Sequence, residues 1–261
     1  MVAGKDLVQS YYFVSNIESC GQMRRSQLSA LIATFAALHA LLYFVPLGLW
    51  RNWATYITPV EAVILGPQAG FFAALLGSVV ARSISPDIFW MFGLVAEPIS
   101  VLAAGLLAKA RWKPVMGGYA VMLLAYFAHP FGRAMPLWTI LDVLIALLLI
   151  YPTARLSRNL YRSDVRRLSA SMVLVSFVCI ATDSLVRVFL LVPCGMYTQF
   201  FTSFDALYVA FVGAAASSYV EDVIVVCASF LVGVPLLLAA SKIGFLRGIK
   251  QGQRKERHST C

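Results

Sequence analysis

The sequence predicts an all-α integral membrane protein, a polytopic bundle of helices, and three observations support this fold class. Of its 261 residues, 60% are hydrophobic and 13% are charged, whereas a soluble domain has roughly 45–50% apolar and about 25% charged residues. Apolar runs recur from residue 28 to residue 241, with polar breaks between them. The runs do not alternate as membrane-spanning strands do, and backbone groups in lipid must bond within their own helix. We therefore expect several helical crossings of the bilayer.

Most of the apolar runs have clear limits, and one stretch is ambiguous. The clear runs are 28–48, 88–108, 115–131, 137–154, 168–193 and about 220–241, with residues 53–82 undecided. Too few residues lie outside these runs to form a water-soluble domain. The expected parts are an N-terminal cytoplasmic segment at 1–27, a transmembrane helical domain at 28–241 and a basic cytoplasmic tail at 242–261.

The first run carries small residues at helical spacing. Ser29, Ala33 and Ala37 recur every four residues, and Ala36 and Ala40 form a second row. Rows of small residues let helix backbones approach closely in lipid, where packing drives association. The two rows are expected either to pack inside the bundle or to dock a membrane partner.

Residues 53–82 predict either a hairpin of two short helices or a single span. The stretch EAVILGPQAGFFAALLG contains Gly66-Pro67, so a helix to Leu65, a turn and a second helix to Ala81 are expected, because the residue before a proline avoids helical angles. The hairpin gives eight segments with both termini inside. Lysine and arginine favour cytoplasmic loops, and all 21 of them then lie inside except Arg51, Arg82, Arg133 and Arg187.

The alternative is a seven-span protein with one helix at 60–82. Length favours this alternative, because a crossing helix needs about 20 residues and each arm of the hairpin is shorter. Charge opposes it, because more lysine and arginine residues then lie outside, among them Arg24 and Arg25 beside the first span. We take the hairpin as the working topology and keep seven spans as the alternative.

Ionisable residues inside the apolar runs predict the functional site. A charge at membrane depth is costly and usually faces a bundle interior or a water-filled cavity. Asp183 and Arg187 are four residues apart on one helix and can pair. The residues expected to line an outward-open substrate pocket are Glu97, Asp183, Arg187, Glu221 and Asp222, with Asn52, Trp53 and Trp90 at its mouth.

Other roles for the same residues stay open. The charged residues are equally compatible with a structural network that holds the helices in register, and the tryptophans with an interfacial aromatic belt. In the eight-segment topology, Glu221 and Asp222 enter the last span from outside, and Glu97 lies near mid-depth. Asp142 is expected to be a solvated charge at a helix start, and Glu61 is a further ionisable residue within an apolar stretch.

The order of several features carries a family resemblance. The turn at 66–70, GPQAG, leads into FFAALLGSVVA; LAAGLLAKARWK follows at 102–113; and TDSLVRVFLLVP at 182–193 precedes the last span. This order resembles the substrate-binding S component of energy-coupling factor (ECF) vitamin transporters. The likeness covers residues 28–113 and 168–241. The helix pair at 115–131 and 137–154 is extra, and Gln68 stands where a lysine is common.

The resemblance implies capture of a small vitamin-like or heterocyclic solute at an outward-facing site, with energy from a partner ATPase module. It also implies that small residues of the first helix dock a transmembrane coupling protein. The matching residues here are Ser29, Ala33, Ala36, Ala37 and Ala40.

Catalytic motifs are sparse. The sequence contains no zinc-protease helix motif, no nucleophile elbow and no Walker-type phosphate loop, so we expect no catalytic residue and no ATP hydrolysis by this chain. Its cysteines form no CxxC pair, and its histidines are scattered, so neither a metal nor a cofactor is expected. His39 is expected to be a satisfied interior histidine, not a ligand. Basic clusters facing anionic lipid account for the net charge of +9 without nucleic acid.

The preferred functional hypothesis is therefore a multi-pass capture subunit in the plasma membrane of a prokaryote, with both termini cytoplasmic and lipid, solute, coupling protein and ATPase as partners. One alternative is a membrane-embedded enzyme or assembly factor that uses Asp183, Arg187 and Glu221 on a lipid-linked substrate. Another is a self-contained secondary carrier.

Overall fold

The computed structural model describes residues 25–45, 52–158 and 165–242. The chain divides into two compact units, Leu31–Val234 and a smaller one made of Met1–Ala30 with Pro235–Cys261. In the smaller unit the described residues are the first turns of one helix and the last turns of another. The predicted cytoplasmic segments 1–27 and 242–261 lie almost wholly outside the described residues.

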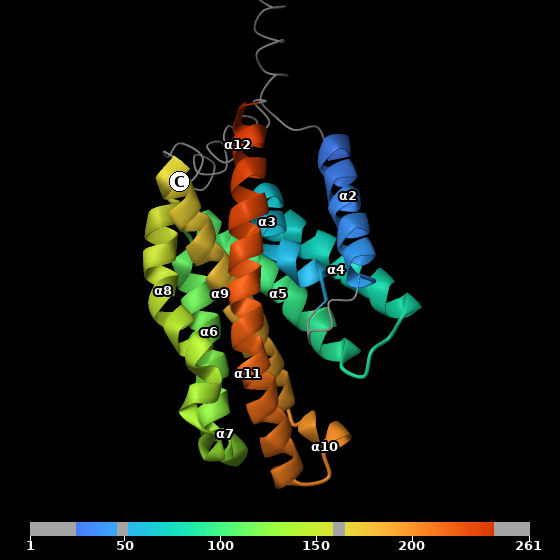
Figure 1. Cartoon of the computed structure of the whole chain (residues 1–261), viewed down its shortest axis with the longest axis vertical. Helices are drawn as coiled ribbons and strands as arrows, with labels where there is room; N and C mark the ends of the chain where they lie inside the picture. The colour runs from blue at the N-terminus through green and yellow to red at the C-terminus, as the bar shows by residue number, and fades with distance from the viewer. Residues whose placement is uncertain (1–24, 46–51, 159–164, 243–261) are drawn as a thin grey trace, which may run out of the picture. The chain divides into compact units, whose positions relative to one another are not determined.

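All regular structure among the described residues is helical, with no strand, which confirms the predicted all-α class (Figure 1). The helices are α2 (Arg25–Tyr43), α3 (Ala54–Leu65), α4 (Pro67–Ile84), α5 (Trp90–Ala108), α6 (Trp112–Ala128), α7 (Pro130–Ala134), the 3-10 turn η1 (Leu137–Ile140), α8 (Leu141–Ser157), α9 (Val165–Leu191), α10 (Tyr197–Phe200), α11 (Phe204–Ala228), the π-helical turn η3 (Ser229–Gly233) and α12 (Val234–Lys242).

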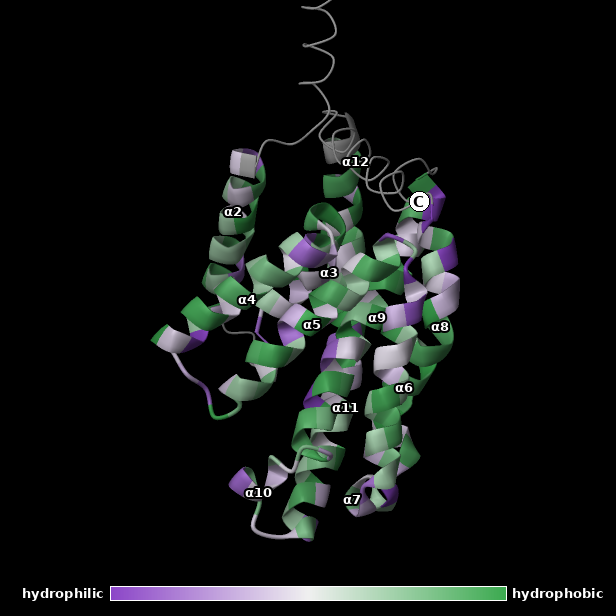
Figure 2. Ribbon diagram, turned by 180° about the vertical axis from the view of Figure 1, so that it is seen from behind, coloured by the Kyte–Doolittle hydropathy of each residue, from purple (hydrophilic) through white to green (hydrophobic). Residues whose placement is uncertain are grey.

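Among the described residues, 5 helical stretches are long and apolar enough to cross a membrane: Ser26–Tyr43, Trp90–Ala108, Leu137–Ser157, Val165–Leu191 and Phe204–Ala239. Helices α3, α4 and α6, which the eight-segment topology also counts, are not among them. Apolar residues, drawn in green in Figure 2, make up most of the length of these helices. The architecture is compatible with a multi-pass membrane protein.

The stretch 53–82 is broken at Gly66, as the Gly-Pro pair predicts. Helix α3 ends at Leu65 and α4 begins at Pro67, with Gly66 at φ 80° and ψ 178°. That conformation is essentially confined to glycine, and proline suits the first position of a helix because it needs no hydrogen-bond donor there. A Cβ on Gly105 of α5 would lie 2.6 Å from the Cα of Pro67, so α5 packs directly against this turn.

The last long helix begins earlier than predicted. It starts at Phe204, where the Ser203 hydroxyl accepts a hydrogen bond from the Ala206 N–H at 3.2 Å, and not near residue 220. This N-cap, followed by Asp205 in the first turn and then a mostly apolar sequence, starts the helix before the polar SSYVED stretch. Glu221 and Asp222 consequently lie in the middle of a long helix, where both are buried. The expectation that they stand at its outer end is wrong.

Helices α5 and α9 form the centre of the larger unit. Helix α5 packs against α3, α4 and α9, while α9 also packs against α6, α8 and α11. The main apolar core lies among α5, α6, α8, α9 and α11, and includes Leu107, Tyr119, Ile150, Leu185 and Leu207. On the side of α5 that faces α3 and α4, buried polar side chains such as Glu61, Ser78 and Glu97 lie among buried apolar ones such as Ala73 and Val101.

Candidate functional site

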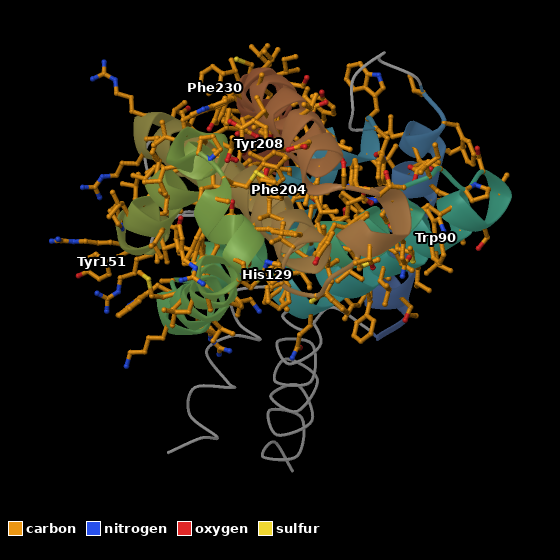
Figure 3. All side chains as sticks on the ribbon, turned by 90° about the horizontal axis from the view of Figure 1, so that it is seen from below. Trp90, His129, Tyr151, Phe204, Tyr208 and Phe230 are labelled. Carbon is orange, nitrogen blue, oxygen red and sulfur yellow. The ribbon has the colours of Figure 1, made fainter. Side chains whose placement is uncertain are left out.

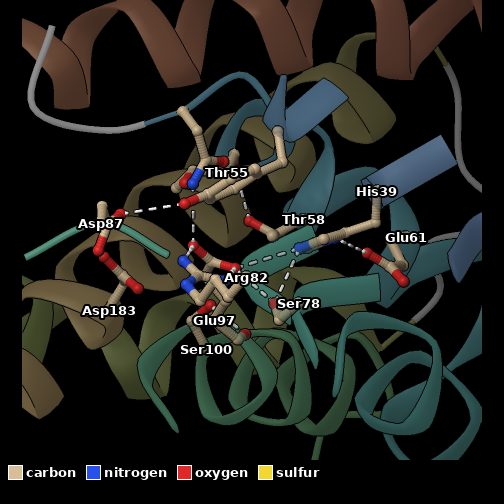
Figure 4. A network of polar contacts seen from close by, with 12 residues as sticks. His39, Thr55, Thr58, Glu61, Ser78, Arg82, Asp87, Glu97, Ser100 and Asp183 are labelled. Carbon is tan, nitrogen blue, oxygen red and sulfur yellow. Dashed lines mark hydrogen bonds and ion pairs between the residues drawn. The ribbon is translucent and has the colours of Figure 1, made fainter. Parts of the chain in front are cut away.

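The side chain of Glu97 on α5 is the centre of a buried charge cluster (Figure 4). Its Oε1 accepts a hydrogen bond from Nη2 of Arg82 at 2.5 Å, and its Oε2 accepts one from Nη1 at 3.0 Å. Two parallel N–H···O bonds between arginine and carboxylate are the strongest form of this ion pair. The pair joins α4 to α5.

Two further groups contact the same carboxylate. The Ser78 hydroxyl donates to Oε2 of Glu97 at 2.6 Å, and Nε2 of His39 lies 3.2 Å from that oxygen. The other ring nitrogen of His39, Nδ1, lies 3.3 Å from Oε2 of Glu61. His39 on α2 therefore bridges a carboxylate on α3 and one on α5, and all three side chains are buried.

Glycines make room for this cluster. A Cβ on Gly93 would occupy the position of the Arg82 guanidinium. A Cβ on Gly77 would lie 2.7 Å from the Cβ of His39 and 2.8 Å from the Ala36 carbonyl oxygen, so α2 and α4 meet closely there. The Arg82 guanidinium also lies 5.1 Å from the centre of the Tyr43 ring, within the range of a cation–π contact.

Arg187 and Asn52 form the accessible edge of the cluster. Arg187 on α9 pairs with Asp183 through Nε at 2.7 Å and Nη2 at 3.3 Å, as their spacing predicts. Its Nη2 also lies 3.6 Å from Oε1 of Glu97, and its side chain is 26% exposed. The Asn52 amide donates to the same oxygen at 3.4 Å. Arg187 and Asn52 thus reach the Glu97 carboxylate from a less buried side than Arg82, Ser78 and His39 do.

We name these eight residues the Glu97 cluster: His39, Asn52, Glu61, Ser78, Arg82, Glu97, Asp183 and Arg187. Several buried polar atoms in and beside it have no hydrogen-bond partner among the described residues, namely Asn52 Oδ1, Thr55 Oγ1, Glu61 Oε1 and Arg82 Nε. Buried polar atoms are nearly always paired with protein or with a bound small molecule such as water. These atoms are hydrogen-bonding groups of the cluster that no described residue satisfies.

The structure brings together four of the predicted pocket residues, Asn52, Glu97, Asp183 and Arg187. Trp53 lies beside Asn52 and packs on Tyr56, with ring centres 5.2 Å apart. Trp90 starts α5 one turn before Gly93 and is 40% exposed (Figure 3).

A second buried polar group lies on the other side of α9. The Tyr119 hydroxyl is 2.9 Å from that of Thr182, and Asp142 and Asp222 are buried as well. Asp142 does stand in the first turn of α8, but it is buried and not solvated. The apolar turn η1 before it and the packing of α8 against α9 and α6 bury it.

Sequence reasoning missed Ser78 and misplaced Arg82, which the eight-segment topology put on the outer side of the membrane. It noted Glu61 only as a further ionisable residue. His39 is an interior histidine with a partner at each ring nitrogen, as expected. Arg82 lies within α4, which ends at Ile84, and is buried. Its long side chain folds onto Glu97 through the space left by Gly93. The four-residue spacing of Ser78 and Arg82, which puts both on one helix face, was the available signal.

The small residues of α2 divide into two sets. Ser29, Ala33 and Ala37 are exposed, Ala36 is half-buried and Ala40 is buried. The first row thus lies on an open face, and the second faces the bundle at Gly77.

No group of three side chains suited to a metal ion occurs among the residues that the structure describes.

Comparison with known proteins places the chain in no described family. No family model matches it, and no solved structure matches it. The chain is similar to the uncharacterized protein MJ0923 of Methanocaldococcus jannaschii, with 27% identity over 131 residues. That match covers 49% of this chain and 44% of the relative. The chain therefore spans less than half the length of the curated relative that it matches.

Proposed function

We propose that this protein is a membrane-embedded capture subunit for a small vitamin-like or heterocyclic solute, energised by a partner ATPase module. The single observation that supports it most is the Glu97 cluster: charged side chains from five helices buried within an otherwise apolar bundle. Ionisable residues within membrane spans are rare because their burial is costly, and they commonly mark substrate or ion pathways.

The edge of the cluster favours a solute with both acceptor and donor groups. Arg187 uses Nε and Nη2 for Asp183 and Glu97, so its partly exposed guanidinium still has Nη1 for a carboxylate or carbonyl oxygen. Asn52 Oδ1 and Thr55 Oγ1 are acceptors without described partners, and they suit a ring N–H or a hydroxyl group. This combination is typical of heterocyclic vitamins and related compounds.

The surface of α2 supports the partner component. The exposed row Ser29, Ala33 and Ala37 permits close approach of another membrane helix. Within these 261 residues there is no Walker-type loop, so any ATP hydrolysis would come from another chain. The proposal includes a plasma-membrane location with both termini cytoplasmic, because the eight-segment topology then puts every lysine and arginine except Arg51, Arg82, Arg133 and Arg187 on the inner side.

The test is to purify the protein in mild detergent and identify any co-extracted small molecule by mass spectrometry. A stoichiometric heterocyclic compound supports the proposal. Its uptake by cells that express this chain is then measured with and without ATP depletion. Uptake that persists without ATP would indicate a self-contained carrier, whereas a retained lipid-linked compound that the protein converts would indicate a membrane enzyme.

A further inference from the structure

His39 is held between two buried carboxylates. Its Nδ1 lies 3.3 Å from Glu61 and its Nε2 lies 3.2 Å from Glu97, and the three side chains are excluded from solvent (Figure 4). They come from three different helices, α2, α3 and α5. No other histidine that the structure describes faces a carboxylate in this way.

This geometry requires a bound proton. A neutral imidazole has one N–H donor and one bare acceptor nitrogen. A bare nitrogen beside a carboxylate oxygen would bring two lone pairs together, so the three groups must hold one proton more than a neutral imidazole and two carboxylates. Glu97 accepts two bonds from Arg82 and one from Ser78, which favours its ionised form. Glu61 is the other group that could carry the extra proton, but an imidazole is a stronger base than a carboxylate, so the proton is assigned to His39.

The charges around His39 agree with this assignment. The groups that face it are Glu61 from α3, Ser78 and Arg82 from α4 and Glu97 from α5, with the Asp183–Arg187 pair of α9 beyond them. With His39 as an imidazolium, the three carboxylates are matched by three cations. Buried charges are stable only when they are compensated in this way.

Buried polar contacts attach α2 to the bundle, beside half-buried apolar residues such as Leu31 and Phe35. Among the residues of α2 whose side chains are described, only His39 and Ala40 are buried. A second polar anchor is near the end of the helix, where the Tyr43 hydroxyl donates to the Ser85 carbonyl at 3.0 Å and approaches Asp87. Within the bundle, the bridge at His39 is the link between α2, α3 and α5.

We propose that His39 is a proton-binding site whose proton fastens residues 31–43 of α2 to α3 and α5. This site goes beyond solute capture and stands independently of it. When pH rises and the proton leaves, a bare nitrogen faces a carboxylate, the link is lost and α2 loosens. When pH falls, the imidazolium forms again and α2 is held.

The protonation is measured by NMR on protein labelled with ¹⁵N-histidine, reconstituted in lipid at pH 7.5. The chain has only 3 histidines, and His39→Gln identifies the signal of His39. His129 is an internal reference, because its Nδ1 accepts the Phe131 N–H at 3.2 Å and must be bare. We expect both ring nitrogens of His39 to carry protons. One bare ring nitrogen on His39 would overturn the site.

The attachment of α2 to the bundle is measured as the distance between spin labels at Leu41 on α2 and Leu148 on α8, in a background without the native cysteines. These two residues are 66% and 77% exposed. We expect one narrow distance while NMR reports the imidazolium, and a broader distribution once His39 has titrated. His39→Gln should be broad at every pH and His129→Gln should match the parent. If His39→Gln does not fold, the pH titration of the parent decides. A distribution of spin-label distances that is unchanged after His39 has lost its proton would contradict the proposal.

Discussion

Arg82 of α4 and Glu97 of α5 form a bidentate ion pair in the interior of the bundle, with N–O distances of 2.5 and 3.0 Å. Both side chains are buried. The remaining members of the cluster come from α2, α3, α4, α9 and the residue Asn52 before α3. They contact the Glu97 carboxylate around this pair or lie one contact further away. The ion pair therefore organises the site as well as the packing of α4 on α5.

Removing one partner of this pair is expected to destabilise the protein strongly. Arg82→Met or Glu97→Leu leaves the other charge buried without its counterion, at a cost of about 3–5 kcal/mol. The double variant should lose less than the sum of the two, because no unpaired charge remains. Thermal unfolding in detergent measures this, with the exposed Arg155→Ala as control. Additive losses would contradict direct pairing.

The space that Gly93 leaves for Arg82 gives a second prediction. Gly93→Ala forces a methyl group into the guanidinium, and overpacking of this kind costs about 1–3 kcal/mol. Gly117→Ala is the matched control, since a Cβ there meets no atom within 4 Å and alanine favours a helix. The unfolding temperature should fall for Gly93→Ala and stay level or rise for Gly117→Ala. Equal unfolding temperatures of the two variants would mean that Gly93 is not needed to make room for the Arg82 guanidinium.

The break between α3 and α4 depends on the backbone of Gly66. At φ 80° and ψ 178°, any other residue is strained by about 1–3 kcal/mol. Gly66→Ala should therefore lower the unfolding temperature, whereas Gly213→Ala, in the open middle of α11, should not. A stabilised Gly66→Ala would indicate that the stretch forms one continuous helix in lipid.

The depth of this turn is a separate prediction, because it fixes the topology. With eight segments, Gln68 is cytoplasmic, and its side chain is exposed. A cysteine at Gln68, in a background without native cysteines, should resist a membrane-impermeant thiol reagent added outside intact cells. A cysteine at the exposed Arg133, in a predicted outer loop, is the positive control. Outside labelling of Gln68→Cys would support seven spans.

Local patterns in the sequence predict part of the fold and of the site. The break at Gly66-Pro67 and the Asp183–Arg187 pair depend on residues close in sequence, so backbone rules and helical spacing are sufficient to find them. The composition likewise predicts the helical class. The start of the last helix was placed too late because Ser203, a weak capping signal, was outweighed by the polar residues near Glu221.

The rest of the cluster depends on contacts between distant segments. His39 lies 58 residues before Glu97, and nothing in either stretch specifies that their side chains meet. The position of Arg82 depends on the missing side chain of Gly93 on another helix. Periodicity identifies which face of a helix is polar, but it does not identify which other helix packs against that face. The Glu97 cluster could therefore be predicted only in part.

The central claim, solute capture at the edge of the Glu97 cluster, is tested most directly by quantitative mass spectrometry of small molecules retained on purified protein. Parent protein, Arg187→Ala and the exposed Arg155→Ala are purified in parallel and compared per mole of folded protein. We expect one heterocyclic compound at near-stoichiometric amounts on the parent and on Arg155→Ala, and at least a tenfold loss on Arg187→Ala. Equal retention by folded Arg187→Ala would contradict binding at this edge, and a lipid-linked compound in its place would contradict solute capture.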